Sequence, residues 1–170
     1  MHSHLGKSAR TSERVADFGD SARLFTIEQA NASLPLVRSI TADLVGRTRE
    51  FVERKERLEG LLAGRRLAPG DPYDEELAQV CTELEQEAQR IEEYQTELRD
   101  LGVLPQGPFD GLVDFPSLRD GRIVFLCWKF GESEVTHWHE TDAGFAGRRP
   151  LETASAVGGE SSRSADTIQP

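Results

Sequence analysis

The apolar positions between residues 35 and 101 recur in two blocks, each with a seven-residue period. The repeating positions of the first block are Val37, Leu44, Phe51 and Leu58, with Ile40 and Leu61 interleaved. Those of the second block are Leu77, Leu84, Ile91 and Leu98, with Val80, Tyr94 and Leu101 interleaved. This spacing is typical of coiled-coil helices. Because only a Gly- and Pro-containing linker at 64–70 separates the blocks, we predict a long antiparallel helical hairpin over residues 26–102.

The first arm carries two signals for a helix start. Thr26 followed by Gln29 is a capping-box pattern, which predicts a short helix from Ile27. Pro35 suits the first turn of a second helix, where its missing N–H has no helical partner. We therefore expect a bend near residues 33–34 and a long helix that continues to about Leu62.

The second arm has signals at both ends. Asp71 is placed to act as an N-cap, and Pro72 fits the first helical position. Gly102 should end this helix, because glycine readily adopts the left-handed conformation that closes a helix.

After residue 102 the pattern changes to short alternating runs. Residues 103–108 read as a linker, and 111–115 as a strand that Pro116 ends. A turn at Asp120-Gly121 precedes a strand over 122–130, and a third strand is expected near 134–140. The predicted fold class is α+β: the helical hairpin with a small antiparallel three-stranded β-meander at its open end.

The division of the chain follows from these elements. We expect residues 23–152 to form a single domain, made of the hairpin at 26–102 and the meander with a C-terminal loop at 103–152. The ends, 1–22 and 153–170, are rich in small and polar residues and have no sustained period. We expect both ends to be disordered tails.

The composition of the chain limits which partners it is expected to bind and in which cellular compartment it is expected to lie. The chain has 170 residues and a formal net charge of −10, which opposes binding to nucleic acid and to anionic membranes. No apolar run approaches the ~20 residues that cross a bilayer, and the N-terminus lacks the apolar core of a secretory signal. Its two cysteines, Cys81 and Cys127, fit a reducing compartment, so the expected location is the cytoplasm.

Charges on the arms favour their pairing and suggest a polar layer. Residues 35–66 carry eight basic and five acidic side chains, whereas residues 72–101 carry ten acidic and two basic ones. Arg47 and Arg54 occupy seam positions on the first arm, and Glu87 occupies one on the second. We predict that Glu87 pairs with Arg47 or Arg54 and so specifies the register of the hairpin; an anion or partner site is the alternative.

Several sequence motifs lie outside the helical arms or at their start. They are LFTIEQANASLP at 24–35, GLVDFP at 111–116, the run 124–132, WHE at 138–140, GFAGR at 144–148 and the pair Pro150-Leu151. Together these motifs resemble those of a bacterial family known only as domain of unknown function 2203. The resemblance covers about residues 24–151. It implies relatives without an established activity, so any role must be argued from the residues themselves.

A metal site is the sharpest chemical hypothesis. Cys127, His137 and His139, with Glu132 or Glu140 as further ligands, suit zinc or a similar divalent metal. If a tight turn pairs Lys129 with Glu134, Leu126 lies opposite His137 and Cys127 faces away from the histidines. A one-residue change in register would bring Cys127 to the histidine face. The commoner two- or four-residue turn favours the first register and therefore a buried structural cysteine.

Two other kinds of site involve neighbouring residues. Residues 144–150 combine glycines with Arg148 and Arg149, a pattern that can bind a small anion, or in which an arginine pairs with Asp110, Asp114 or Glu140. Alternatively, His139 with Glu140 and Asp114 could form an acid-base pair, with Cys127 as a nucleophile. The sequence lacks the common nucleotide-binding and hydrolase motifs.

These observations lead to two functional expectations. The first is a noncatalytic interaction or adaptor protein that uses the hairpin to bind a protein partner or to self-associate. The alternative is a metal- or small-anion-binding protein, extending to an enzyme, that uses residues 127–148.

Overall fold

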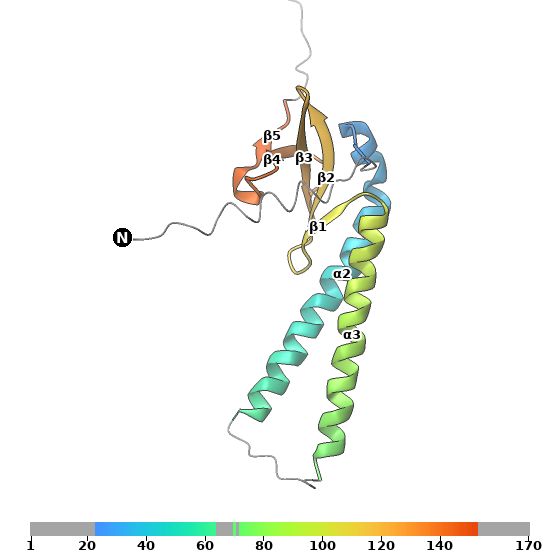
Figure 1. Ribbon diagram of the computed structural model, residues 1–170, viewed down its shortest axis with the longest axis vertical. Helices are drawn as coiled ribbons and strands as arrows, with labels where there is room; N and C mark the ends of the chain where they lie inside the picture. Colours follow the sequence, from blue (N-terminus) through green and yellow to red (C-terminus); the bar gives the residue numbers. More distant parts are fainter. Residues whose placement is uncertain (1–22, 64–69, 71, 153–170) are drawn as a thin grey trace, which may run out of the picture.

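The computed structural model describes residues 23–63, 70 and 72–152. Two long helices form an antiparallel hairpin, and a small antiparallel sheet packs against the end of the hairpin that lies opposite the linker (Figure 1). This arrangement confirms the predicted α+β fold. The predicted tails, and the linker apart from Gly70, lie outside the described residues.

The first arm is one continuous helix, α2, which spans Ile27–Leu62. Its capping box is present: Gln29 N–H donates to Thr26 Oγ1 (3.2 Å), and Thr26 N–H donates to Gln29 Oε1 (3.0 Å). The expected second helix start is wrong, because Pro35 lies inside the helix. Proline removes one helical hydrogen bond, but Leu34 and Val37 on either side are buried in the core, and this burial keeps the helix continuous.

The second arm, α3, spans Asp74–Asp100, and its N-cap is Tyr73. It therefore begins two residues later than Pro72, and Asp71 lies outside the described residues. The C-terminal prediction is confirmed: Gly102 has a φ of 83°, and its N–H donates to the Arg99 carbonyl (2.8 Å). Val103 N–H reaches the Leu98 carbonyl (2.9 Å), which completes a Schellman motif with both side chains buried.

The two helices pack closely only near the sheet. Apolar residues of the predicted seams are buried there: Val37, Ile40, Leu44, Leu84, Ile91 and Leu98. Farther out, Leu58 and Leu77 are only half-buried and Leu61 is 60% exposed. The ribbons also separate toward the linker in Figure 1. The hairpin is thus present, but its seam is buried along only part of its length.

A polar layer crosses the hairpin. Arg47 donates to Glu87 at 3.0 Å, and its guanidinium also lies 5.8 Å from the ring centroid of Tyr94. The ion pair between Arg47 and Glu87 was one of the two predicted alternatives. Arg54 pairs instead with Glu83, one helical turn nearer the linker, at 2.7 Å.

The sheet has five strands rather than three. They follow one another as an antiparallel meander in the order β1 (Leu104–Gly107), β2 (Leu112–Arg119), β3 (Arg122–Lys129), β4 (His137–Glu140) and β5 (Arg149–Pro150). The segment read as a linker contains β1, and the Arg148 loop contributes the 3₁₀ turn η1 (Phe145–Gly147) and β5. Strands as short as β1 and β5 are difficult to predict from the sequence, because their stability comes from pairing with a neighbouring strand and not from the residues of the strand itself.

Pro116 does not end β2, contrary to expectation. In an antiparallel strand the N–H and C=O of one residue point to the same side. The Pro116 carbonyl accepts from Phe25 N–H (2.7 Å), at an edge that β1 no longer covers. The missing N–H therefore faces that edge and not β3, where it would interrupt the ladder.

The predicted turn between β2 and β3 is present. Arg119 pairs with Arg122 across a two-residue loop, in which Asp120 and Gly121 have φ of 51° and 74°. Positive φ at both positions suits the twist of a tight hairpin.

The favoured register between β3 and β4 is wrong. Cys127 lies opposite His137, and Phe125 lies opposite His139. The connection is not a tight turn but the loop 130–136, whose Glu132 carboxylate accepts from Lys129 N–H (2.9 Å). Val135 N–H donates to Asn31 Oδ1 on α2 (2.8 Å). These anchors determine the loop length and hence which residues face each other.

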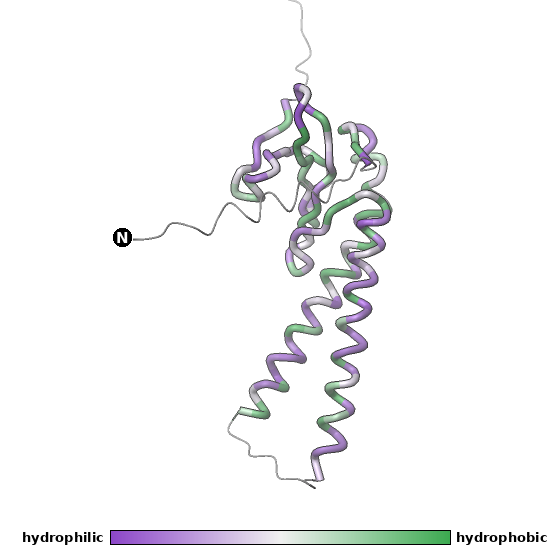
Figure 2. Tube along the Cα trace, in the orientation of Figure 1, coloured by the Kyte–Doolittle hydropathy of each residue, from purple (hydrophilic) through white to green (hydrophobic). Residues whose placement is uncertain are grey.

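The two faces of the sheet differ in chemistry. One face supplies the core with Val113, Phe115, Val124, Leu126, Trp128 and Trp138, which join α2 and α3 residues in one cluster. Figure 2 shows apolar residues along β2 and β3 and at intervals along both helices. Each large side chain buried in this way contributes roughly 1.5–3 kcal/mol to the free energy of unfolding.

Across the described residues, neither helix is long and apolar enough to span a membrane.

Candidate functional site

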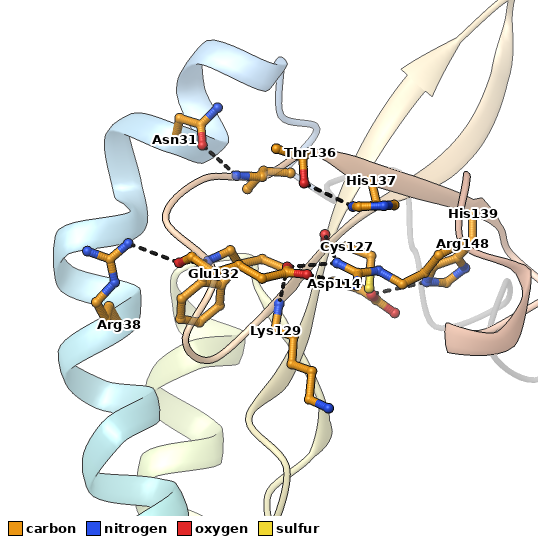
Figure 3. A network of polar contacts seen from close by, with 12 residues as sticks. Asn31, Arg38, Asp114, Cys127, Lys129, Glu132, Thr136, His137, His139 and Arg148 are labelled. Carbon is orange, nitrogen blue, oxygen red and sulfur yellow. Dashed lines mark hydrogen bonds and ion pairs between the residues drawn. The ribbon is translucent and has the colours of Figure 1, made fainter. Parts of the chain in front are cut away.

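The opposite face of the sheet brings three potential metal ligands together. Asp114 on β2 lies opposite Cys127 on β3. On β4 the residue opposite Cys127 is His137, and His139 lies two positions farther along that strand. Directly paired residues share a face, as do residues two apart on one strand. All three side chains are buried, and their potential ligand atoms lie within 4.8 Å of one another (Figure 3).

The imidazole of His139 is held at both nitrogens. Nδ1 lies 2.8 Å from the Glu140 carbonyl oxygen, and Nε2 lies 3.1 Å from Asp114 Oδ1. Since a carbonyl can only accept, Nδ1 carries a hydrogen. Nε2 therefore points at a carboxyl oxygen, and a proton must lie between them for this contact to be favourable.

The protonation of this pair follows from its surroundings. Burial lowers the pKa of His139, but the hydrogen bonds to Asp114 and to the Glu140 carbonyl, together with the charge of Asp114, outweigh burial. The net effect raises the pKa of His139 above its usual value of 6.5. In the absence of metal, contact with the Asp114 carboxyl group therefore favours the protonated form of the imidazole.

Cys127 is a neutral thiol in this arrangement. Burial, followed by the charge of Asp114, raises the pKa of the Cys127 thiol to about 12, against the opposing effect of Arg148. A nucleophilic cysteine needs a lowered pKa. The metal-free site therefore does not activate Cys127 for nucleophilic attack, although a divalent cation would favour its thiolate.

Arg148 forms an ion pair beside these three residues. Its guanidinium donates to both oxygens of Glu132, at 2.8 and 2.7 Å, and to the Cys127 carbonyl at 3.2 Å. Only 12% of the Arg148 side chain is exposed. Glu132 thus occupies the fork that was predicted to bind an anion, in place of the expected partners Asp110, Asp114 and Glu140.

The same ion pair is connected to the helices. Arg38 on α2 donates to the carbonyl of Ser133 (2.9 Å), and the Trp128 indole N–H donates to the Glu132 carbonyl (3.0 Å). Figure 3 shows this path from α2 through Glu132 to Arg148 and the strand that carries Cys127. The loop 130–136 therefore ties the candidate site to the hairpin.

The other predicted site residues lie outside the three-residue cluster. His137 is on the same face, but its Nδ1 contacts Thr136 Oγ1 (2.9 Å). The Glu140 side chain approaches Arg122 at 3.9 Å, while its backbone carbonyl orients His139. Arg149 lies over the Trp138 ring, 5.3 Å from its centroid.

Two roles were missed from sequence. Asp114 was assigned to an anion site or an acid-base pair, not to the metal ligands, and Glu132 was not recognised as the partner of Arg148. For Asp114 a signal was available, because a lone carboxylate lies within the otherwise apolar strand segment 112–116. A buried charge of this kind needs a partner or a metal.

A comparison with family models identifies relatives of this protein. The model described as "Uncharacterized conserved protein (DUF2203)" matches residues 23–151. The chain belongs to this family, as the resemblance of its motifs indicated. No curated protein and no solved structure matches the chain.

Proposed function

We propose that this member of the DUF2203 family is a metal-binding protein that holds one divalent ion, with zinc the best suited, through Asp114, Cys127 and His139. The observation that supports the proposal is the buried convergence of a carboxylate, a thiol and an imidazole from three adjacent strands. These ligand types are those of zinc sites.

The orientation of His139 supports metal binding further. A histidine that binds a metal through one nitrogen commonly donates its other N–H to a carbonyl or carboxylate. Nδ1 already donates to the Glu140 carbonyl, which leaves Nε2 directed toward Asp114 and Cys127. The metal would replace the proton that this pair shares.

Ligand geometry and charge are consistent with this ion. Zinc ligands at about 2.0–2.3 Å from the metal lie roughly 3.3–3.8 Å from one another in a tetrahedron. The three ligand atoms are within 4.8 Å, so modest side-chain rotation brings them to these distances. Three protein ligands leave a fourth position for water or a small ligand, and a divalent ion offsets the two anionic ligands.

Metal analysis of purified protein tests the proposal. The chain is stripped with a chelator, reloaded with zinc, and its metal content measured, in a His2→Ala/His4→Ala background that removes N-terminal histidines. About one equivalent per chain is expected. Asp114→Asn, Cys127→Ser and His139→Gln should each lose most of it, whereas His137→Gln and Cys81→Ser should retain it.

Cobalt substitution adds a readout for the thiolate ligand. A cysteine thiolate bound to cobalt gives a charge-transfer absorption, which should appear in the wild type and vanish in Cys127→Ser. Protein that takes up no stoichiometric metal, or that keeps it in the three ligand variants, would overturn the proposal.

A second candidate role concerns the hairpin, which we expected to bind a protein partner. The exposed seam residue Leu61 supports such an interaction role. The two free cysteines support a reducing compartment, and the cytoplasm is the location we propose. Neither role requires an enzymatic activity.

A further inference from the structure

The outer part of the hairpin contains an apolar groove that the described residues leave open. It has a volume of about 410 Å³ and lies between the last turns of α2 and the first turns of α3. Its apolar lining includes Leu58, Leu61, Leu62, Leu77 and Val80. All of these except Leu62 are seam positions, which the seven-residue repeat predicts to be covered by another helix.

Part of the apolar lining of the groove is exposed to solvent. Leu61 is 60% exposed, and the half-buried Leu58 and Leu77 face each other across diverging helices. Exposed apolar side chains at seam positions are typical of helix–helix interfaces. To cover these side chains within one chain, α2 and α3 would have to move toward each other. Another pair of helices can cover them without such a movement.

The rim of the groove carries opposite charges on its two walls. Arg57 lies on the α2 wall and Glu76 on the α3 wall. Arg54 is already paired with Glu83, whereas among the described residues Arg57 and Glu76 form no ion pair. A surface that is positive on one side and negative on the other is complementary to itself after a half-turn rotation.

We propose that the occupant of this groove is a second copy of the chain, docked about a two-fold axis so that Arg57 of each copy meets Glu76 of the other. The charge of the arms favours this pairing. α2 carries six basic and six acidic side chains, whereas α3 carries ten acidic and two basic ones. Two α3 helices side by side would repel, so α2 of one copy packs against α3 of the other. The result is a four-helix bundle at the end of the hairpins distant from the sheets.

Sedimentation of the full chain over a range of concentrations tests the dimer. Wild-type protein should dimerise, and Leu61→Lys should weaken the dimer by at least about tenfold, because it places a charge in the buried centre. Leu61 is exposed in the single chain, so this change leaves the fold intact; circular dichroism checks that it does.

Charge reversal distinguishes a second copy from any other partner. Arg57→Glu alone and Glu76→Arg alone should each weaken self-association by about tenfold, because each creates two like-charge contacts. An equimolar mixture of the two variants should associate nearly as well as wild type, since the glutamate introduced in one chain then meets the arginine introduced in the other. Reversals outside the groove, Arg49→Glu and Glu85→Arg, are matched controls and should have little effect.

Two results would overturn the dimer. One is a wild-type chain that stays monomeric throughout the concentration range, which would point to a different occupant. The other is a dimer that both single charge reversals leave unchanged, or that the mixture fails to restore. Neither result bears on the metal site, which lies on the sheet.

Discussion

Asp114 and His139 meet across the central strand of the sheet, with Oδ1 of the aspartate 3.1 Å from Nε2 of the histidine. They come from β2 and β4, and Cys127 on β3 lies between them. Both side chains are buried, and the contact with Asp114 raises the pKa of His139.

Replacing the aspartate should change the titration of the histidine. In Asp114→Asn, burial still lowers the pKa of His139, whereas of the raising effects only the hydrogen bond to the Glu140 carbonyl remains, so this pKa should fall. Asp114→Ala should destabilise the metal-free protein by about 3 kcal/mol, as expected for a broken buried pair. Asp114→Asn should destabilise it less, since the amide can donate to unprotonated Nε2. NMR titration of the ring and urea unfolding measure the two effects; an unchanged His139 titration in Asp114→Asn would contradict the assignment.

The two cysteines should differ sharply in reactivity. Cys81 is exposed on α3, whereas Cys127 is buried and burial raises the pKa of its thiol to about 12. A disulfide reagent should therefore modify one thiol rapidly in native metal-free protein and the second only after unfolding. Cys81→Ser should abolish the rapid reaction and Cys127→Ser should preserve it. Rapid modification of native Cys81→Ser would show that Cys127 is accessible.

The Glu132–Arg148 ion pair should make stability depend on acid pH. Burial raises the pKa of Glu132, but the hydrogen bonds from Arg148 and Lys129 N–H outweigh burial and hold the pKa below its usual 4.5. A lowered pKa in the folded state stabilises the protein above the unfolded-state value and ceases to do so as pH falls through the folded-state value.

Wild type should therefore exceed Glu132→Gln in unfolding free energy by about 2 kcal/mol near neutral pH. This difference should shrink as the pH falls below about 4.5. Urea unfolding at several pH values measures it, and the exposed neighbour Glu134→Gln serves as the control. A difference that stays constant into acid would show that the carboxylate of Glu132 is not responsible.

Gly111 should tolerate no side chain. It has a φ of 69°, and an added Cβ would meet the Cβ of Phe130 and lie 3.0 Å from Val45 Cγ2 on α2. Gly121 has a similar φ of 74° but open space around it. Gly121→Ala should destabilise the fold by about 1 kcal/mol through backbone strain, and Gly111→Ala by about 2 kcal/mol more through overpacking. Equal losses in thermal or urea unfolding would mean that the helix and sheet can separate at this contact.

Local patterns determined the helical hairpin and its ends. The seven-residue repeat, the capping box of Thr26 and Gln29, and the stop at Gly102 depend on residues within one or two helical turns of each other. The turn at Asp120-Gly121 is equally local. The ion pair of Glu87 with Arg47 was one of two predicted alternatives, because two seams joined by a short linker leave few registers. For such features, short-range spacing carries the information.

The candidate site was decided by contacts far apart in the sequence. Val135 N–H binds Asn31, which lies 104 positions earlier, and Arg148 binds Glu132. These contacts hold the loop 130–136 at its length, and a one-residue change in that length would exchange the two faces of β4. The sequence by itself therefore determined which residues could serve as ligands. Only tertiary packing placed Cys127 and His139 on one face and brought Asp114 to them, because strand register depends on the sum of distant anchors rather than on local preference.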